Sequence, residues 1–222
     1  MPTVRFYKLN SEKKQRIWNA AFHEFSRVPL EKASINRIIR EAKISRGSYY
    51  TYFSDKWDLL MYVMEEAGEH LYAQMCLSLE ESQGEIWKML EQLLKYMLEM
   101  CSEREKKEFL KNVLGFSQER MDRKFWEKCI RPEQKTRQDI LSEEIYQKCA
   151  GVSIVQMKKE EFQVFLQMAL FLLEAEVRMA LQGDSEYQIW NRYRVEERIL
   201  KRGVGIPDSR NLETERLSAM VS

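Results

Sequence analysis

Apolar residues recur at helical spacing along most of the chain, and the first such stripe covers residues 11–27. Ser11 stands at the cap position before this stripe, and Pro29 follows its end. Basic residues occupy the opposite side. The apolar positions are Ile17, Ala20, Ala21, Phe22 and Phe25. The pattern predicts an amphipathic helix near the start of the chain.

Two shorter helices are predicted next, over residues 34–42 and 45–53, with a break of about three residues between them. Ser34 and Ser45 stand at their cap positions, because a serine hydroxyl there accepts a bond from a free backbone N–H group. A fourth helix begins near residue 55. Three short helices therefore occupy the first part of the chain.

Beyond Gly84 the stripes become longer. The clearest runs from about residue 157 to 182 and ends at Gly183, and a last amphipathic stretch covers residues 185–202. The chain holds only 8 glycines and 4 prolines, fewer turn formers than a loop-rich or all-β fold needs. The pattern predicts an all-α protein.

The helix at 157–182 is apolar over most of its circumference, so it is buried on more than one side. It is either a central core helix or a helix shared with a second subunit, and we favour the second interpretation. The side chains assigned to a dimer interface are Phe162, Phe165, Leu166, Ala169, Leu172 and Leu173.

Composition narrows the possible classes of protein. The strongest apolar run, 168–173, is far shorter than the roughly 20 residues that span a bilayer. The N-terminus has no apolar signal core, so we expect a cytoplasmic protein. The 4 cysteines and 2 histidines lack the spacing of a metal site, and no acid/base constellation is visible, so we expect no cofactor, no metal and no enzyme activity.

The net charge of +1 hides an asymmetry along the chain. Residues 1–60 carry 12 Lys/Arg and six Asp/Glu, whereas the remainder carries 24 Lys/Arg and 29 Asp/Glu. The N-terminal part is therefore the part that a polyanion attracts.

Residues 34–53 have the proportions of a helix-turn-helix unit, whose second helix enters the DNA major groove with its N-terminal end first. Arg46 is suited to a guanine edge or a phosphate, and Gly47 lets the backbone approach the groove. Ser48, Thr51 and the tyrosine hydroxyls are donors to bases or phosphates. Lys56 opens the next helix, where its ammonium group and free N–H groups meet a phosphate.

Helical register divides the aromatic residues of this segment. Tyr49 and Phe53 are four positions apart and share a face, so we expect them in the core. Tyr50 and Tyr52 are expected on the exposed, DNA-facing side.

Residues 17–60 resemble the DNA-binding domain of the TetR family of bacterial transcriptional regulators. The matching parts are the run from Ala20 to Phe25, the Ser34–Ile38 opening of the second helix, and the Ile44–Leu60 segment. The resemblance implies that Ser34 and Tyr50 contact phosphates. It further implies that the residues of the DNA-binding site are Ser34, Ser45, Arg46, Gly47, Ser48, Tyr50, Thr51, Tyr52 and Lys56.

Two positions depart from the family pattern. Tyr52 stands where a histidine is common, and Lys43 occupies a turn position that is often glycine. If the backbone at Lys43 has a positive φ, the lysine costs of order 1 kcal/mol more than glycine.

The resulting domain prediction is a helix-turn-helix domain at 1–56, a larger helical ligand-binding and dimerisation domain at 57–202, and a loosely ordered tail at 203–222. The function predicted is a homodimeric repressor that binds a double-stranded operator and is released by an apolar or aromatic small molecule. The side chains assigned to the ligand pocket are Trp87, Phe109, Phe116, Phe125, Trp126 and Tyr146. The alternative is a DNA-binding or partner-binding helical protein without a small-molecule effector.

Overall fold

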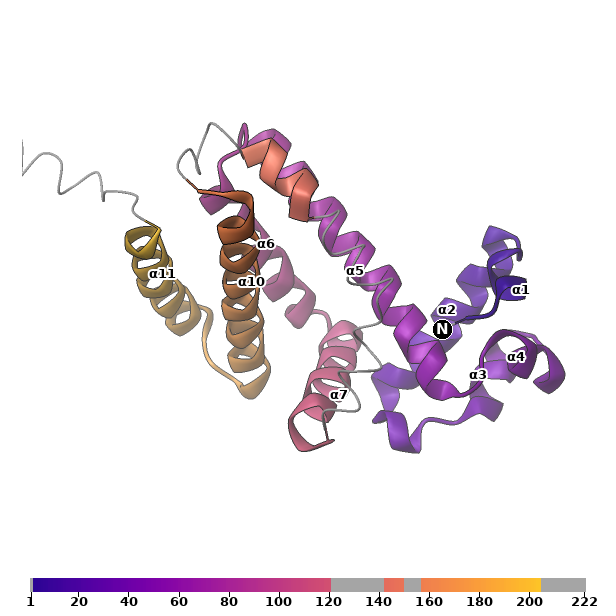
Figure 1. The fold of residues 1–222 in the computed structure, drawn as a ribbon. Coiled ribbons are helices and arrows are strands. Elements are labelled where there is room, and N and C mark those ends of the chain that lie inside the picture. Colours follow the sequence, from indigo (N-terminus) through magenta and orange to yellow (C-terminus); the bar gives the residue numbers. More distant parts are fainter. Residues whose placement is uncertain (1, 121–141, 150–156, 205–222) are drawn as a thin grey trace, which may run out of the picture.

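The computed structural model describes residues 2–120, 142–149 and 157–204, and within these ranges every regular element is a helix (Figure 1). Residues 142–149 form a short helical stretch of their own. The other elements, in chain order, are α1 (Val4–Tyr7), α2 (Ser11–Arg27), the short 3-10 helix η1 (Leu30–Lys32), α3 (Ile35–Glu41), α4 (Arg46–Tyr52), α5 (Lys56–Glu81), α6 (Ile86–Ser102), α7 (Arg104–Arg120), α10 (Lys159–Gln182) and α11 (Glu186–Gly203). The all-α class predicted from the sequence is confirmed.

Side-chain caps set the start of most of the N-terminal helices. Ser45 accepts a bond from the backbone of Ser48 and begins α4, as predicted, and Asp55 likewise begins α5. Asn10, and not Ser11, caps α2, because its side chain accepts from the Lys13 backbone at 2.9 Å.

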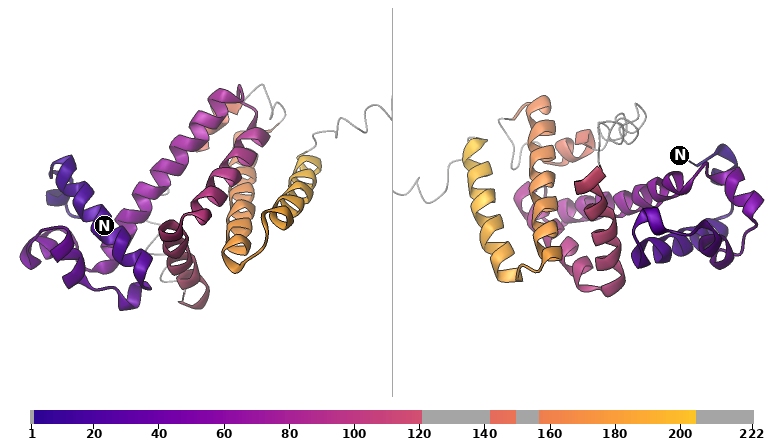
Figure 2. Two further views of the ribbon diagram at one scale, coloured as in Figure 1. Left: turned by 180° about the vertical axis from the view of Figure 1, so that it is seen from behind. Right: turned by 90° about the horizontal axis from the view of Figure 1, so that it is seen from below.

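Two apolar cores lie at opposite ends of the long helix α5. Figures 1 and 2 show the short N-terminal helices around the start of α5 and α6 near its other end. The N-terminal core contains side chains from helices α1, α2, α3 and α4 and from the first half of α5. Its α5 residues extend to Val63, past the domain boundary predicted at residue 56. The C-terminal core joins the end of α5 to α6, α10, α11 and the stretch at 142–149. One continuous helix therefore links the two ends of the molecule.

In the C-terminal half α6, α10 and α11 lie side by side, with α10 packed against both neighbours (Figure 2). The predicted end of the strongest helix is confirmed, since Gly183 follows α10 in the left-handed conformation with φ of +113°. Asp184 N–H donates to the Met179 carbonyl at 3.0 Å, which closes the last turn.

The structure corrects the face of α10 that was assigned to a dimer. Phe162, Phe165, Leu166, Ala169 and Leu173 are buried inside the protomer's own C-terminal core, and Leu172 is half-buried. Buried side chains cannot offer a surface to a second subunit. The sequence pattern indicates that much of the α10 surface is apolar, but it does not show which apolar residues face the protomer's own core and which face outward.

Two of the thiols described are buried, Cys101 and Cys149. Burial raises the pKa of the Cys149 thiol to about 12, so the thiol stays protonated at neutral pH. This is the behaviour of a packing residue. Cys129 lies outside the described residues.

None of the helices in the described ranges combines the length and the apolar character that crossing a membrane requires.

Candidate nucleic-acid interface

The turn between α3 and α4 is built around Lys43, whose φ is +53°. The Lys43 N–H donates to the Arg40 carbonyl, and the Ile44 N–H donates to the Ile39 carbonyl at 3.0 Å. This pair of bonds ends α3 tightly and redirects the chain into α4. The positive φ considered from the sequence is therefore present, and a lysine occupies it.

We expect Lys43→Gly to raise the free energy of unfolding by about 1 kcal/mol, because glycine adopts this conformation without a Cβ clash. Urea denaturation measures the change. Lys43→Ala is the matched control, since it removes the same charge but keeps the strain. An equal gain in both variants would assign the effect to charge and not to the backbone.

Arg46 is the first residue of α4 and is exposed. Its Nη1 donates to the Asn36 Oδ1 of α3 at 3.3 Å, and its guanidinium lies 5.8 Å from the centre of the Tyr50 ring. Contacts on both sides hold the arginine over the outer surface of the unit. The sequence analysis did not identify Asn36, although a polar side chain near the start of the first helix of a helix-turn-helix unit is a reasonable candidate for a contact with the second helix.

Gly47 lies beside Arg46 and is also exposed. A Cβ added there would meet only the Ser45 hydroxyl, at 3.9 Å, so the packing of the protein does not require glycine. Without a side chain at Gly47, no atoms project from the surface at this position near the N-terminal end of α4.

The hydroxyls of α4 are largely engaged with the helix itself. Ser45 and Ser48 place their Oγ atoms 2.9 Å apart, and the Thr51 hydroxyl donates to the Gly47 carbonyl at 2.9 Å. The Thr51 hydroxyl therefore has no proton left to donate, but it can still accept a bond, and its methyl group can also make a contact.

The structure confirms the expected burial or exposure of three of the four aromatic residues. Tyr49 and Phe53 are completely buried, and Tyr50 is 48% exposed. The expectation for Tyr52 is wrong, because only 8% of it is exposed and Lys13 Nζ donates to its hydroxyl at 3.2 Å. Tyr52 follows Tyr49 by three positions and so shares its face, a signal that the sequence already contained.

Ser34 and Lys56 are brought to the same edge of the unit. Lys56 Nζ donates to the Glu31 carbonyl at 2.6 Å and lies 3.5 Å from the Ala33 carbonyl, next to Ser34. The Ser34 hydroxyl makes no capping bond. The lysine predicted to meet a phosphate at the start of α5 thus reaches toward the start of α3.

A buried carboxylate fixes this edge from inside. Glu24 is 4% exposed, accepts the Ser34 N–H at 2.8 Å and pairs with Arg27 at 2.8 Å. Glu24 was missed from the sequence, although it falls on the apolar stripe of α2 beside Ala20 and Ala21.

The predicted ligand-pocket residues do not line one site. Trp87 belongs to the C-terminal core, whereas Phe109 packs against Phe22 in the N-terminal core, with ring centres 4.9 Å apart. Tyr146 donates to the Met157 carbonyl and contacts Phe162. Outside the described side chains lie Phe116, Phe125 and Trp126.

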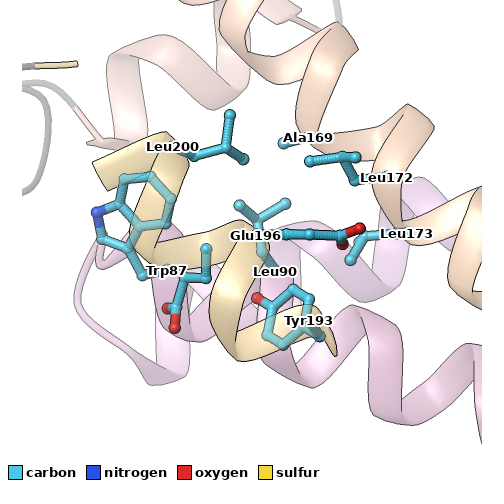
Figure 3. A pocket seen from close by; sticks show the side chains of 9 residues that line it. Trp87, Leu90, Ala169, Leu172, Leu173, Tyr193, Glu196 and Leu200 are labelled. Carbon is cyan, nitrogen blue, oxygen red and sulfur yellow. The ribbon is translucent and has the colours of Figure 1, made fainter. Parts of the chain in front are cut away.

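A small hollow does lie between α6, α10 and α11 (Figure 3). Apolar side chains form most of its wall, together with Trp87, Tyr193 and Glu196. Its volume of about 10 Å³ is enough for one water molecule at most. As it stands, it is too small for a drug-sized ligand.

Helix α7 connects the C-terminal half directly to α2. Asn112 Nδ2 donates to the carbonyls of Phe25 and Ser26 at 2.9 and 3.0 Å. His23 of α2 lies between Glu41 of α3 and Glu105 of α7. Among the described residues, the helix-turn-helix unit is therefore connected to the C-terminal half through α5 and α7.

These features define the chain as a helix-turn-helix protein with a second, all-helical domain. Residues 17–63 match the family model described as bacterial regulatory proteins, tetR family. Over residues 17–63 the chain is therefore similar to bacterial regulatory proteins of the tetR family, as the motif predicted. The sequence match is confined to the helix-turn-helix part and the first turns of α5.

Solved structures of TetR-family transcriptional regulators share the fold. One from Streptomyces coelicolor has a TM-score of 0.58 and 17% identity, covering 96% of this chain and 99% of that chain. One from Pectobacterium atrosepticum has a TM-score of 0.58 and 16% identity, covering 89% and 97% of the two chains. A search of curated proteins gave no significant match. At these identities the structural likeness carries the fold alone.

Proposed function

We propose that the protein is a homodimeric repressor that binds a pseudo-palindromic operator in the cytoplasm and is released by a small molecule. The observation that carries the proposal is the outer surface of α4. Arg46, Gly47 and Tyr50 are exposed there together, on a helix that Ser45 caps at its N-terminal end. This is the end that a helix-turn-helix unit presents to the major groove.

The roles proposed within this surface follow from chemistry. Arg46 reads a base edge, because a guanidinium donates two bonds to the acceptors of guanine. Gly47 allows the backbone to approach, and Ser48 and Thr51 add short contacts. Tyr50, Ser34 and Lys56 bind phosphates, which fixes the register of the helix without reading sequence.

A dimer is required because a palindromic site presents the same half-site twice. The surface proposed for it is the outer stripe of α10, where Val164, Met168 and Phe171 are 57%, 53% and 69% exposed. These residues are four and three positions apart, so they share one side of the helix. Exposed apolar side chains in such a stripe indicate a surface that a partner covers.

Release by a ligand would act through the two connections to the helix-turn-helix unit. A shift of α5 or α7 changes the distance between the two α4 helices of a dimer and so weakens their joint fit to DNA. The ligand must bind the released arrangement more tightly than the DNA-bound one, because equal affinity shifts no population.

A regulator without a small-molecule effector is the second candidate. The tight packing between α6, α10 and α11 favours it, since the hollow there holds about 10 Å³. A thermal-shift screen of aromatic compounds separates the two candidates, because only a ligand-responsive protein is stabilised by a compound that also releases DNA.

We expect Arg46→Ala to cost about 1–3 kcal/mol of affinity for a DNA duplex selected by the wild-type protein, and to relax base preference at one position in each half-site. Fluorescence anisotropy with point-substituted duplexes measures both effects. Arg198→Ala, on exposed α11, is the control for the same change in net charge. Equal losses in both variants, or unchanged base preference in Arg46→Ala, would remove Arg46 from the readout.

A further inference from the structure

Residues 2–8 precede the part of the chain that matches the family model, yet they fold against the end of α4. The Thr3 backbone N–H donates to the Tyr52 carbonyl at 2.9 Å. The Thr3 hydroxyl donates to the Thr51 carbonyl at 2.8 Å. One residue therefore binds two consecutive carbonyls at the C-terminal end of α4.

These two carbonyls belong to the group that a helix leaves without internal partners. Helix α4 has only 7 residues, so a large part of its backbone belongs to one end or the other. Isolated helices of this length are unstable in water, and their order depends on packing and on caps. Ser45 supplies the cap at the first end, and Thr3 supplies bonds at the second.

Packing adds to these bonds. Phe6 of α1 is completely buried, and its ring centre lies 4.9 Å from that of Phe53 and 4.8 Å from that of Tyr62. It also contacts Tyr52 edge-on at 6.0 Å. Phe6 thus joins the last turn of α4 to α5.

We propose that residues 2–8 form an N-terminal clamp that positions α4 for DNA binding, with Thr3 and Phe6 as its positioning residues. The clamp rests on the proposed function, since it matters to DNA only if α4 is the reading helix. Its effect is to limit fraying and rotation of α4, so that Arg46 and Tyr50 keep their orientation at the other end.

The burial of Tyr52 has its explanation in the same segment. Phe6 covers one side of its ring, and Lys13 of α2 donates to its hydroxyl. Tyr52 therefore serves as the surface on which the clamp packs, and it is not available as an open phosphate contact.

The test compares Thr3→Val with Thr3→Ser in the full chain. Valine keeps the shape of threonine but removes the hydroxyl, whereas serine keeps the hydroxyl. Hydrogen–deuterium exchange followed by mass spectrometry measures the opening of α4 without DNA. Anisotropy measures affinity for a duplex selected by the wild-type protein.

For Thr3→Val we expect several-fold faster exchange in the peptide that covers residues 46–53, and unchanged exchange in α2 and α10. Affinity should fall on the order of fivefold, the effect of one lost hydrogen bond. Thr3→Ser should match the wild type in both measurements. Faster exchange in every helix would indicate a general loss of stability and would overturn a positioning role.

Unchanged exchange at residues 46–53 in Thr3→Val would also overturn the clamp, whatever the result with DNA. The proposed function fails by a different result, namely a wild-type protein that selects no sequence. The two proposals therefore fail on separate measurements.

Discussion

We expect Phe171→Glu to convert a dimer at micromolar concentration into a monomer and to weaken binding to a palindromic duplex by about 10²–10⁴-fold. Phe171 is 69% exposed, the largest exposure in the outer stripe of α10 that also contains Val164 and Met168. A carboxylate there would have to leave water when a second copy covers the stripe. Loss of the dimer removes the gain that comes from binding two half-sites together.

Sedimentation equilibrium measures the mass, and anisotropy with full and half-site duplexes measures the affinity. Leu77→Glu is the matched control, because Leu77 is 51% exposed on α5, outside the proposed stripe. Phe171→Glu should still bind a half-site as the wild type does, since α4 is unaltered. A variant that remains a dimer would exclude this stripe as the subunit interface.

The second large effect concerns the contact between α10 and α11. Glu176 of α10 is 1% exposed and accepts two bonds from Arg192 of α11, at 2.6 and 2.7 Å. Arg192 also donates to Asp184 in the turn between these helices at 3.0 Å. These bonds raise the pKa of Arg192, with Glu176 as the main cause, so the guanidinium stays charged.

We expect Arg192→Leu to lower the free energy of unfolding by about 3–5 kcal/mol, because it leaves the buried Glu176 carboxylate without a cation. Chemical denaturation measures the loss. The double variant Glu176→Leu with Arg192→Leu should recover most of it, since no buried charge then remains. Arg198→Leu, on the exposed side of α11, controls for the loss of one positive charge and should change stability little. A single variant as stable as the wild type would show that water or another group satisfies Glu176.

Much of the helix-turn-helix part could be predicted from the sequence because its signals are local. The caps at Ser45 and Asp55, the burial of Tyr49 and Phe53, and the exposure of Tyr50 all follow from positions within one or two turns. Such signals depend on backbone geometry that neighbouring residues determine by themselves.

The errors involve contacts between segments distant in sequence. Tyr52 shares a face with Tyr49, a local signal, but the residue that covers it is Phe6, from a helix that was not predicted. Phe109 lies in the N-terminal core because α7 packs against α2, although α5 and α6 separate these two helices in the sequence. Periodicity identifies an apolar face but does not name the element that covers it.

Helix α10 illustrates the same limit. Its wide apolar surface predicted burial on more than one side, but within the protomer the buried side chains of α10 share one face. Five of the six interface residues named from the sequence lie on that face, in the protomer's own core. The outer stripe at Val164, Met168 and Phe171 separates from the inner one only when α6 and α11 are in place.

The central claim is that α4 reads a palindromic duplex as part of a dimer. Selection of duplexes from a random pool by the full chain, followed by measurement of the mass of the complex, tests this claim most directly. We predict enrichment of an inverted repeat whose half-sites lie about one helical turn, or a multiple of it, apart, with a symmetric dimer on each repeat. A pool that remains random, or a single unrepeated site bound by one protomer, would contradict it.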